Sequence, residues 1–168
     1  MVLFMPVHKR LGVVIIREDL VKPHPANIPV LSELDTMLEK DSMYNTPPCW
    51  AIYMLGLVVK WIDEQGGLEV MKEKNEKKAK LLYDYLDQSD FYKPHAKKDA
   101  RSNMNVTFTT PSKELDAEFV KESIAAGMTN LKGHRSVGGI RASIYNAMPY
   151  EGVEYLVNFM KEFEEKHK

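Results

Sequence analysis

The sequence has very little cysteine, and this excludes a disulfide framework. Cys49 is the only cysteine among 168 residues, so the chain can form neither an internal disulfide nor a Cys-x-x-Cys metal or redox motif. We expect Cys49 to be buried as a small apolar residue rather than reactive. The histidines have no spacing typical of a metal site, and we predict none.

Long apolar runs and excess charge are also missing. The formal net charge is −1, which gives no reason to expect a nucleic-acid partner. The longest apolar run, residues 51–59, stops at Lys60 and falls far short of the ~20 residues that a membrane span requires. The apolar first seven residues are too few for a signal peptide. We therefore expect a soluble, cytoplasmic protein with no membrane partner.

The first third of the chain predicts one strand and one helix. Residues 13–16 are all β-branched, which is typical of a strand buried on both faces of a mostly parallel sheet. Three prolines between residues 23 and 29 predict a loop as far as residue 41, with one helical turn at 31–38. Thr46 before two prolines predicts a capped helix start. The helix over 49–64 is apolar almost all round, so we expect it to be buried, bridging two halves of a larger structure.

The rest of the chain predicts an α+β unit. From residue 63 the expected order is helix, strand, strand, helix, strand, helix, with helices packed on one face of a small antiparallel or mixed sheet. The Lys/Glu run over 72–80 is predicted as a solvated helix face. The expected core residues are Leu68, Met71, Ala79, Leu82, Leu86, Met104, Val106, Phe108, Leu115, Phe119, Val120, Ile124, Ile140, Ala142, Ile144, Val153, Leu156, Val157, Met160 and Phe163.

Residues 133–147, GHRSVGGIRASIYNA, place two guanidinium groups and an imidazole around a glycine turn that leads into an alternating strand. Arginine forks match carboxylate and phosphate oxygens, and glycines let backbone N–H groups approach an anion. His134, Arg135 and Arg141 are therefore candidate ligands of a small dianion. The structural alternative is that both arginines form ion pairs and His134 packs at a turn.

With YNTPP at residues 44–48, this loop resembles the phosphoserine aminotransferase family, class V aminotransferases of fold type I that use pyridoxal phosphate. The similarity runs from about Val13 to the C-terminus. It implies transfer of an amino group from glutamate to 3-phosphohydroxypyruvate, giving O-phosphoserine in serine biosynthesis. It further implies that Arg141 clamps the substrate α-carboxylate, and that His134 and Arg135 help to hold the substrate phosphate of the neighbouring subunit's site.

The resemblance also assigns roles to the second motif and to the two parts of the chain. Asn45 and Thr46 would reach across a homodimer interface to the phosphate of the partner's pyridoxal phosphate, a role compatible with a cap and turn at a helix N-terminus. Residues 1–62 would be a remnant of the large cofactor-binding domain with an interdomain helix. Residues 63–168 would be the C-terminal small domain.

One residue that the resemblance leads us to expect is missing from the sequence. In the family, the lysine that forms a Schiff base with the cofactor precedes the strand that matches residues 13–19, in a segment reading roughly QKNIGP. Residues 2–12 here read VLFMPVHKRLG, which puts Phe4 near the place of that lysine and makes Lys9 a poor substitute. We therefore expect the C-terminal half of an aminotransferase, with no catalytic residue, no covalently held cofactor and no activity alone. The alternative is a non-catalytic small-domain module that binds an anion or a partner.

Overall fold

The computed structural model describes residues 3–8, 11–21 and 27–168. The chain divides into two compact units, Met1–Glu64 and Gln65–Lys168. The assignment of these parts to a cofactor-domain remnant and a small domain stays a prediction.

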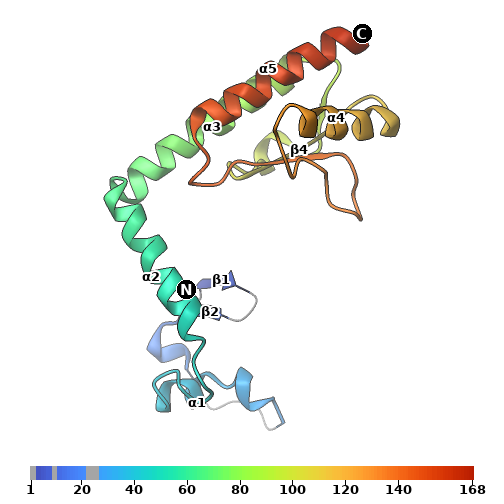
Figure 1. Ribbon diagram of the computed structural model, residues 1–168. Coiled ribbons are helices and arrows are strands. Elements are labelled where there is room, and N and C mark those ends of the chain that lie inside the picture. Colours follow the sequence, from blue (N-terminus) through green and yellow to red (C-terminus); the bar gives the residue numbers. More distant parts are fainter. Residues whose placement is uncertain (1–2, 9–10, 22–26) are drawn as a thin grey trace. The chain divides into compact units, whose positions relative to one another are not determined.

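The first unit consists of a hairpin, short helical turns and one long helix (Figure 1). Strand β1 pairs with β2 in antiparallel register, with Leu3 opposite Ile15 and Met5 opposite Val13. Where the sequence predicts one helical turn at 31–38, the structure has the 3-10 turn η2 and the helix α1, which together extend one residue beyond each end of that range. The elements are β1 Leu3–His8, β2 Leu11–Ile15, η1 Glu18–Leu20, η2 Val30–Ser32, α1 Leu34–Glu39 and α2 Cys49–Glu64.

The prediction of a strand buried in a parallel sheet is wrong. Strand β2 belongs to a two-stranded antiparallel sheet, with β1 as its partner. Val14 and Ile15 are 41% and 60% exposed. Burial on both faces requires neighbouring strands and helices above and below, and the described part of the first unit supplies neither.

Helix α2 has the predicted bounds, but it is not buried. None of its residues is buried, and Trp50 is 74% exposed. Cys49 is also exposed, which corrects the expectation of a small buried side chain. The described part of this unit offers no packed core against which so apolar a helix could lie. None of the described helices combines the length and the apolar character needed to span a membrane.

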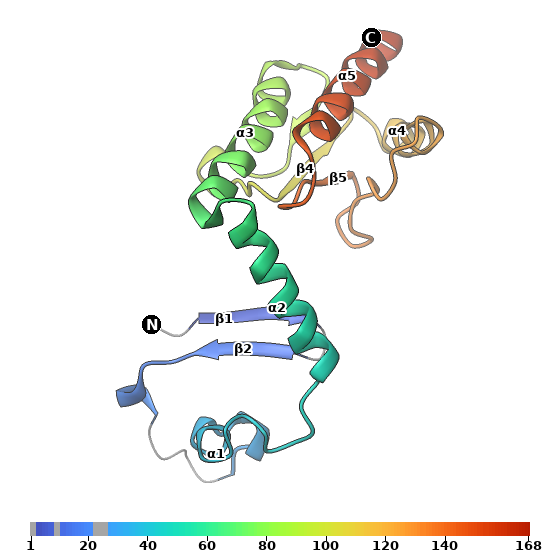
Figure 2. The same cartoon turned by 60° about the vertical axis from the view of Figure 1, so that its left-hand side comes forward.

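The second unit has the predicted order of helices and strands (Figure 2). Its sheet is antiparallel in the order β3-β4-β5. The elements are α3 Gly67–Gln88, β3 Lys93–Pro94, η3 Lys98–Ala100, β4 Asn105–Thr109, α4 Lys113–Ala125, β5 Ile140–Ser143 and α5 Tyr150–His167.

One face of this sheet packs on the helices. Along β4, buried Val106 and Phe108 alternate with half-buried residues, because successive strand side chains point to opposite faces. Phe119 of α4 is fully buried, and its ring contacts those of Phe108 and Phe163. The buried members of the core are Ala79, Leu82, Tyr83, Leu86, Phe91, Tyr92, Val106, Phe108, Phe119, Leu131, Ile140, Ala142, Ile144, Val153, Leu156, Val157, Met160 and Phe163.

Two predicted core residues are exposed. Leu68 is 77% exposed because it lies in the first turn of α3, ahead of Met71, the first buried residue of that helix. Ile124 is 56% exposed, and the neighbouring Ser123 is buried in its place. The α4 stripe is therefore rotated by one residue at its C-terminal end. A single helix turn contains too little pattern to fix that rotation.

Candidate anion-binding site

The loop over residues 133–139 has a backbone that requires glycine. Gly138 and Gly139 have φ values of 80° and 69°, in the left-handed region that β-carbons disfavour. The Gly133 N–H donates to the Gly139 carbonyl at 2.8 Å. A β-carbon on Gly133 would lie 2.0 Å from the Gly138 carbonyl oxygen. The predicted glycine turn is therefore present, and it fixes how the loop returns to β5.

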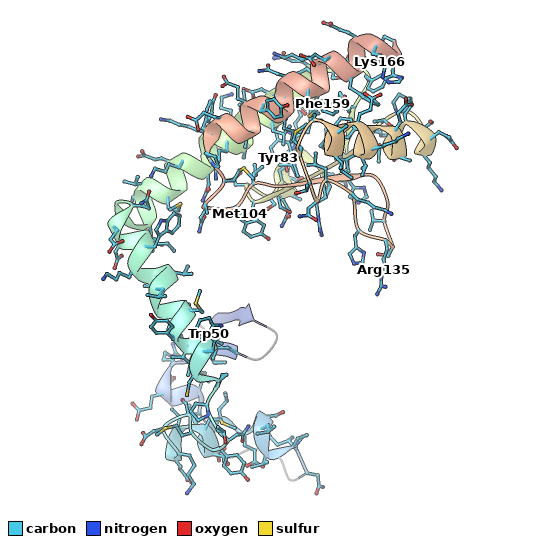
Figure 3. All side chains as sticks on the ribbon, viewed as in Figure 1. Trp50, Tyr83, Met104, Arg135, Phe159 and Lys166 are labelled. Carbon is cyan, nitrogen blue, oxygen red and sulfur yellow. The ribbon has the colours of Figure 1, made fainter. Side chains whose placement is uncertain are left out.

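His134 is oriented by its own loop. Its Nδ1 lies 2.6 Å from the Ser136 hydroxyl oxygen and accepts the Ser136 N–H at 3.3 Å. An accepting Nδ1 assigns the hydrogen of the neutral ring to Nε2, which leaves Nε2–H to donate to a ligand. Both His134 and Arg135 are exposed. Figure 3 shows Arg135 at the outer end of the loop.

A groove of about 810 Å³ lies between this loop and the start of α4. Lys113, Lys132, His134 and Arg135 are among its lining residues. Its one acidic lining residue is Asp116, whose carboxylate accepts from the N–H and the hydroxyl of Thr110 at 2.8 and 2.9 Å. The cations are therefore in excess along this groove, which favours an anionic ligand.

Arg141 lies apart from the groove, on β5. It pairs across the sheet with Thr107, and its neighbours Ile140 and Ala142 are buried in the core. Alternation therefore directs Arg141 to the sheet face that the helices leave open. Its Nε is buried and has no hydrogen-bond partner among the described residues. A buried guanidinium donor without a partner is suited to an acceptor that comes from outside this unit.

Asn45 and Thr46 belong to the first unit, where both are exposed. Helix α2 begins at Cys49, so two prolines separate Thr46 from its first turn. The described residues give the Thr46 hydroxyl no hydrogen bond to α2, and the predicted cap is not formed. The first backbone N–H groups of the helix have no intrahelical acceptor, so this end can still attract a phosphate.

Sequence reasoning missed two buried polar residues of α3. Lys78 is 2% exposed and Asn75 is 4% exposed, although the Lys/Glu run containing them predicts a solvated face. Burial lowers the pKa of Lys78. The Lys78 ammonium donates to the carbonyls of Tyr145 and Met148, about 70 residues along the chain. No local signal could reveal them, because their partners lie in a distant turn.

A second cluster of titratable groups lies at the C-terminal end of α5. Potential metal-ligand atoms of Glu118, Glu122 and His167 lie within 4.8 Å of one another. Glu122 already forms an ion pair with Lys166, and Glu118 is exposed. Sequence reasoning did not find this cluster, because Glu118 and Glu122 belong to α4 and His167 belongs to α5, far along the chain. We assign no ion to it.

The chain matches the family Aminotransferase class-V over residues 9–156. It belongs to the class V aminotransferases. The prediction that the Schiff-base lysine is missing depends on Phe4 and Lys9, whose side chains lie outside the described residues, so it stays a prediction.

Several relatives are phosphoserine aminotransferases. The protein from Desulfatibacillum aliphaticivorans is 56% identical over 156 residues, covering 92% of this chain and 43% of its own length. The protein from Niallia circulans is 55% identical over 152 residues, 90% of this chain and 42% of its own. This chain therefore spans less than half the length of the relatives that it matches.

Solved structures show the same likeness. Phosphoserine aminotransferase from Bacillus circulans subsp. alkalophilus has a TM-score of 0.87 at 52% identity, covering 94% of this chain and 44% of that one. A phosphoserine aminotransferase from Trichomonas vaginalis, solved with pyridoxal phosphate bound, has a TM-score of 0.83 at 41% identity, over 89% and 43%. The α+β fold, with its antiparallel sheet, is that of an aminotransferase fragment.

Proposed function

We propose that this chain is the C-terminal half of a phosphoserine aminotransferase, a cytoplasmic enzyme of serine biosynthesis. The reaction would transfer the amino group of glutamate to 3-phosphohydroxypyruvate, giving O-phosphoserine and 2-oxoglutarate. The observation that carries the proposal is 56% identity over 92% of the chain to a protein of that name. The cationic loop and the unpartnered Arg141 donor support it independently, because both suit a substrate that carries a carboxylate and a phosphate.

Arg141 would hold the substrate α-carboxylate. A guanidinium can make two parallel hydrogen bonds to a carboxylate, and this fixes orientation as well as adding affinity. The Nε donor of Arg141 has no competing partner among the described residues. Orientation of the carboxylate would in turn orient the Cα–H bond of the substrate, from which the proton must be removed.

His134 and Arg135 would select for the substrate phosphate of a neighbouring subunit. The Nε2–H of His134 and the exposed Arg135 guanidinium are separate donors on one loop. A dianion can satisfy both, whereas a substrate without a phosphate leaves both unpaired. Unpaired donors lower the affinity for such analogues.

Pyridoxal phosphate would be the cofactor, and when bound it serves as the electron sink of amino-group transfer. Asn45 and Thr46 fit its phosphate, because both are exposed beside the start of α2, where backbone N–H groups favour an anion. In a homodimer these two residues would serve the partner's cofactor. The exposed apolar residues of α2 are a suitable contact for a second copy.

This chain contains no residue that we assign to catalysis. The lysine that would hold the cofactor covalently has no equivalent in it, so proton transfer at the substrate Cα would lack its base. Single acid–base groups contribute about 10² to 10⁴-fold to rate. We therefore expect no aminotransferase activity from the chain alone. After incubation with pyridoxal phosphate and borohydride, peptide mass mapping should find no stoichiometric label, and specific labelling of Lys9 would overturn this expectation.

Binding of O-phospho-L-serine tests the proposed site directly. We expect the chain to bind it weakly, with NMR signals of Arg135 and Arg141 shifting during the titration. Arg141→Ala should lose about 1.5 to 3 kcal/mol of binding free energy, toward the lower end because solvent screens a half-built site. Lys93→Ala, on the edge strand β3, is the control. If the NMR signals of the wild type do not shift during the titration, the alternative of a non-catalytic small-domain module becomes the better explanation.

A further inference from the structure

A tight turn follows β5 and precedes α5. The Met148 N–H donates to the Tyr145 carbonyl at 2.9 Å, which closes a β-turn over residues 145–148. Tyr145 lies only two residues beyond Ser143, the last residue of β5. The position of this turn therefore fixes the end of the strand that carries Arg141.

Two buried side chains of α3 hold the turn. The Lys78 Nζ donates to the Tyr145 carbonyl at 2.7 Å and to the Met148 carbonyl at 2.9 Å, so it joins the two ends of the turn. Asn75 Nδ2 donates to Asn146 Oδ1 at 2.7 Å. Asn75 and Lys78 are three residues apart and share one helix face. A buried ammonium is tolerated only where its hydrogen bonds are satisfied, so the turn and Lys78 depend on each other.

Hydrogen bonds of the Tyr145 side chain connect the turn to the open face of the sheet. Its hydroxyl accepts from Asn105 Nδ2 at 2.6 Å, and Asn105 Oδ1 accepts from the Ser143 hydroxyl at 3.1 Å. Asn105 and Ser143 are cross-strand partners, as are Thr107 and Arg141. All four therefore occupy the same face. Tyr145 is held through its carbonyl by α3 and through its hydroxyl by the face on which Arg141 lies.

We propose that Lys78 and Asn75 are positioning residues for Arg141, acting through the turn at the end of β5. The proposal rests on the proposed function, in which Arg141 binds the substrate carboxylate. The Arg141 Nε has no partner among the described residues, so the guanidinium is not held in place there by a hydrogen bond of its own. Its placement then depends on the strand, and the strand end depends on Lys78 and Asn75.

The test uses the whole chain, with O-phospho-L-serine as the probe and the Arg141 Nε–Hε NMR signal as the local readout. We expect Lys78→Met to shift that signal in the free protein and to weaken binding by roughly tenfold. Two controls should leave both readouts unchanged. Lys80→Met removes an exposed lysine of the same helix, and Val157→Ala truncates a buried core residue of α5, outside the turn over residues 145–148.

A second variant keeps the test decisive if Lys78→Met does not fold. Tyr145→Phe removes only the hydroxyl bonded to Asn105, and its side chain is 53% exposed, so the fold should survive. We expect the same shift of the Arg141 signal with a loss of roughly two- to fourfold in affinity.

The outcomes separate the two proposals. If Arg141→Ala weakens binding but Lys78→Met and Tyr145→Phe leave the Arg141 signal and the affinity unchanged, the positioning proposal alone is overturned. If Val157→Ala moves both readouts as much as Lys78→Met, the effect is general destabilisation and the proposal is again overturned. If Arg141→Ala binds as tightly as the wild type, the proposed function of Arg141 fails, and its positioning with it.

Discussion

Helix α2 and helix α5 have similar lengths but opposite relations to water. Helix α2 is the more apolar, yet none of its residues is buried, whereas α5 buries six. The difference lies in their surroundings, because α5 packs along α3 and over the sheet while the first unit has no packed core among its described residues. Apolar composition shows that a helix needs a partner, but only the rest of the fold shows whether the partner is present.

Core truncation should separate the two units most sharply. Phe119→Ala removes a fully buried ring that contacts four other aromatic rings, and it should cost about 3 to 5 kcal/mol of unfolding free energy. Trp50→Ala removes a ring that is 74% exposed, and it should change stability by less than about 0.5 kcal/mol. Urea unfolding of dilute protein measures both. Equal losses would show that α2 belongs to a core of its own.

Two lysines of α3 offer a finer comparison. Lys78→Met leaves the carbonyls of Tyr145 and Met148 without their donor, and we expect a loss of about 2 kcal/mol. Lys80→Met breaks an exposed pair with Asp84 and should cost less than about 0.5 kcal/mol. The same unfolding measurement applies. A neutral Lys78→Met would mean that the buried ammonium does not stabilise the turn.

The smallest effect is expected in acid. Hydrogen bonds from Arg101 lower the pKa of Asp87 from 3.8 to about 2. A carboxylate with a lowered folded-state pKa stabilises the protein fully above its unfolded pKa, and this contribution is lost as the pH falls through the folded value. Asp87→Asn should therefore flatten the fall in stability between about pH 4 and 2.

The control for this prediction is Asp84→Asn, which removes an equal charge from the exposed pair with Lys80. Stability measured by urea unfolding at several pH values should retain the wild-type slope in this variant. The account of the Asp87–Arg101 pair would be wrong if both variants gave the same pH profile.

The order of helices and strands in the second unit could be predicted from sequence because most of its elements have a clear periodicity. The alternation of β5 places its buried residues correctly, and the helical pattern of α5 finds every buried residue except Glu164, since both strand and helix face one nearby core. Lys78 could not be found in this way. A lysine within a Lys/Glu run is typical of a solvated face, and the carbonyls that bind it lie about 70 residues away.

Only the part of the candidate site that depends on local sequence could be predicted. The glycine turn follows from local backbone demands, and the structure has it. The separation of Arg141 from the groove beside His134 and Arg135 depends on strand pairing, which the motif does not encode. The burial predicted for α2 was wrong because composition indicates that a helix is apolar, but not whether a packed core lies beside it. The roles of Asn45, Thr46, His134, Arg135 and Arg141 stay predictions.

Hydrogen exchange at two protein concentrations tests the central contrast most directly. We expect amides of α3, β4 and α5 to be protected equally at low and high concentration, because the second unit carries its own core. Amides of α2 should exchange quickly in dilute protein and slow down as the concentration rises, because in the proposed homodimer a second copy would cover the exposed apolar residues of α2. Protection of α2 equal to that of α5 at the lowest concentration would contradict this account.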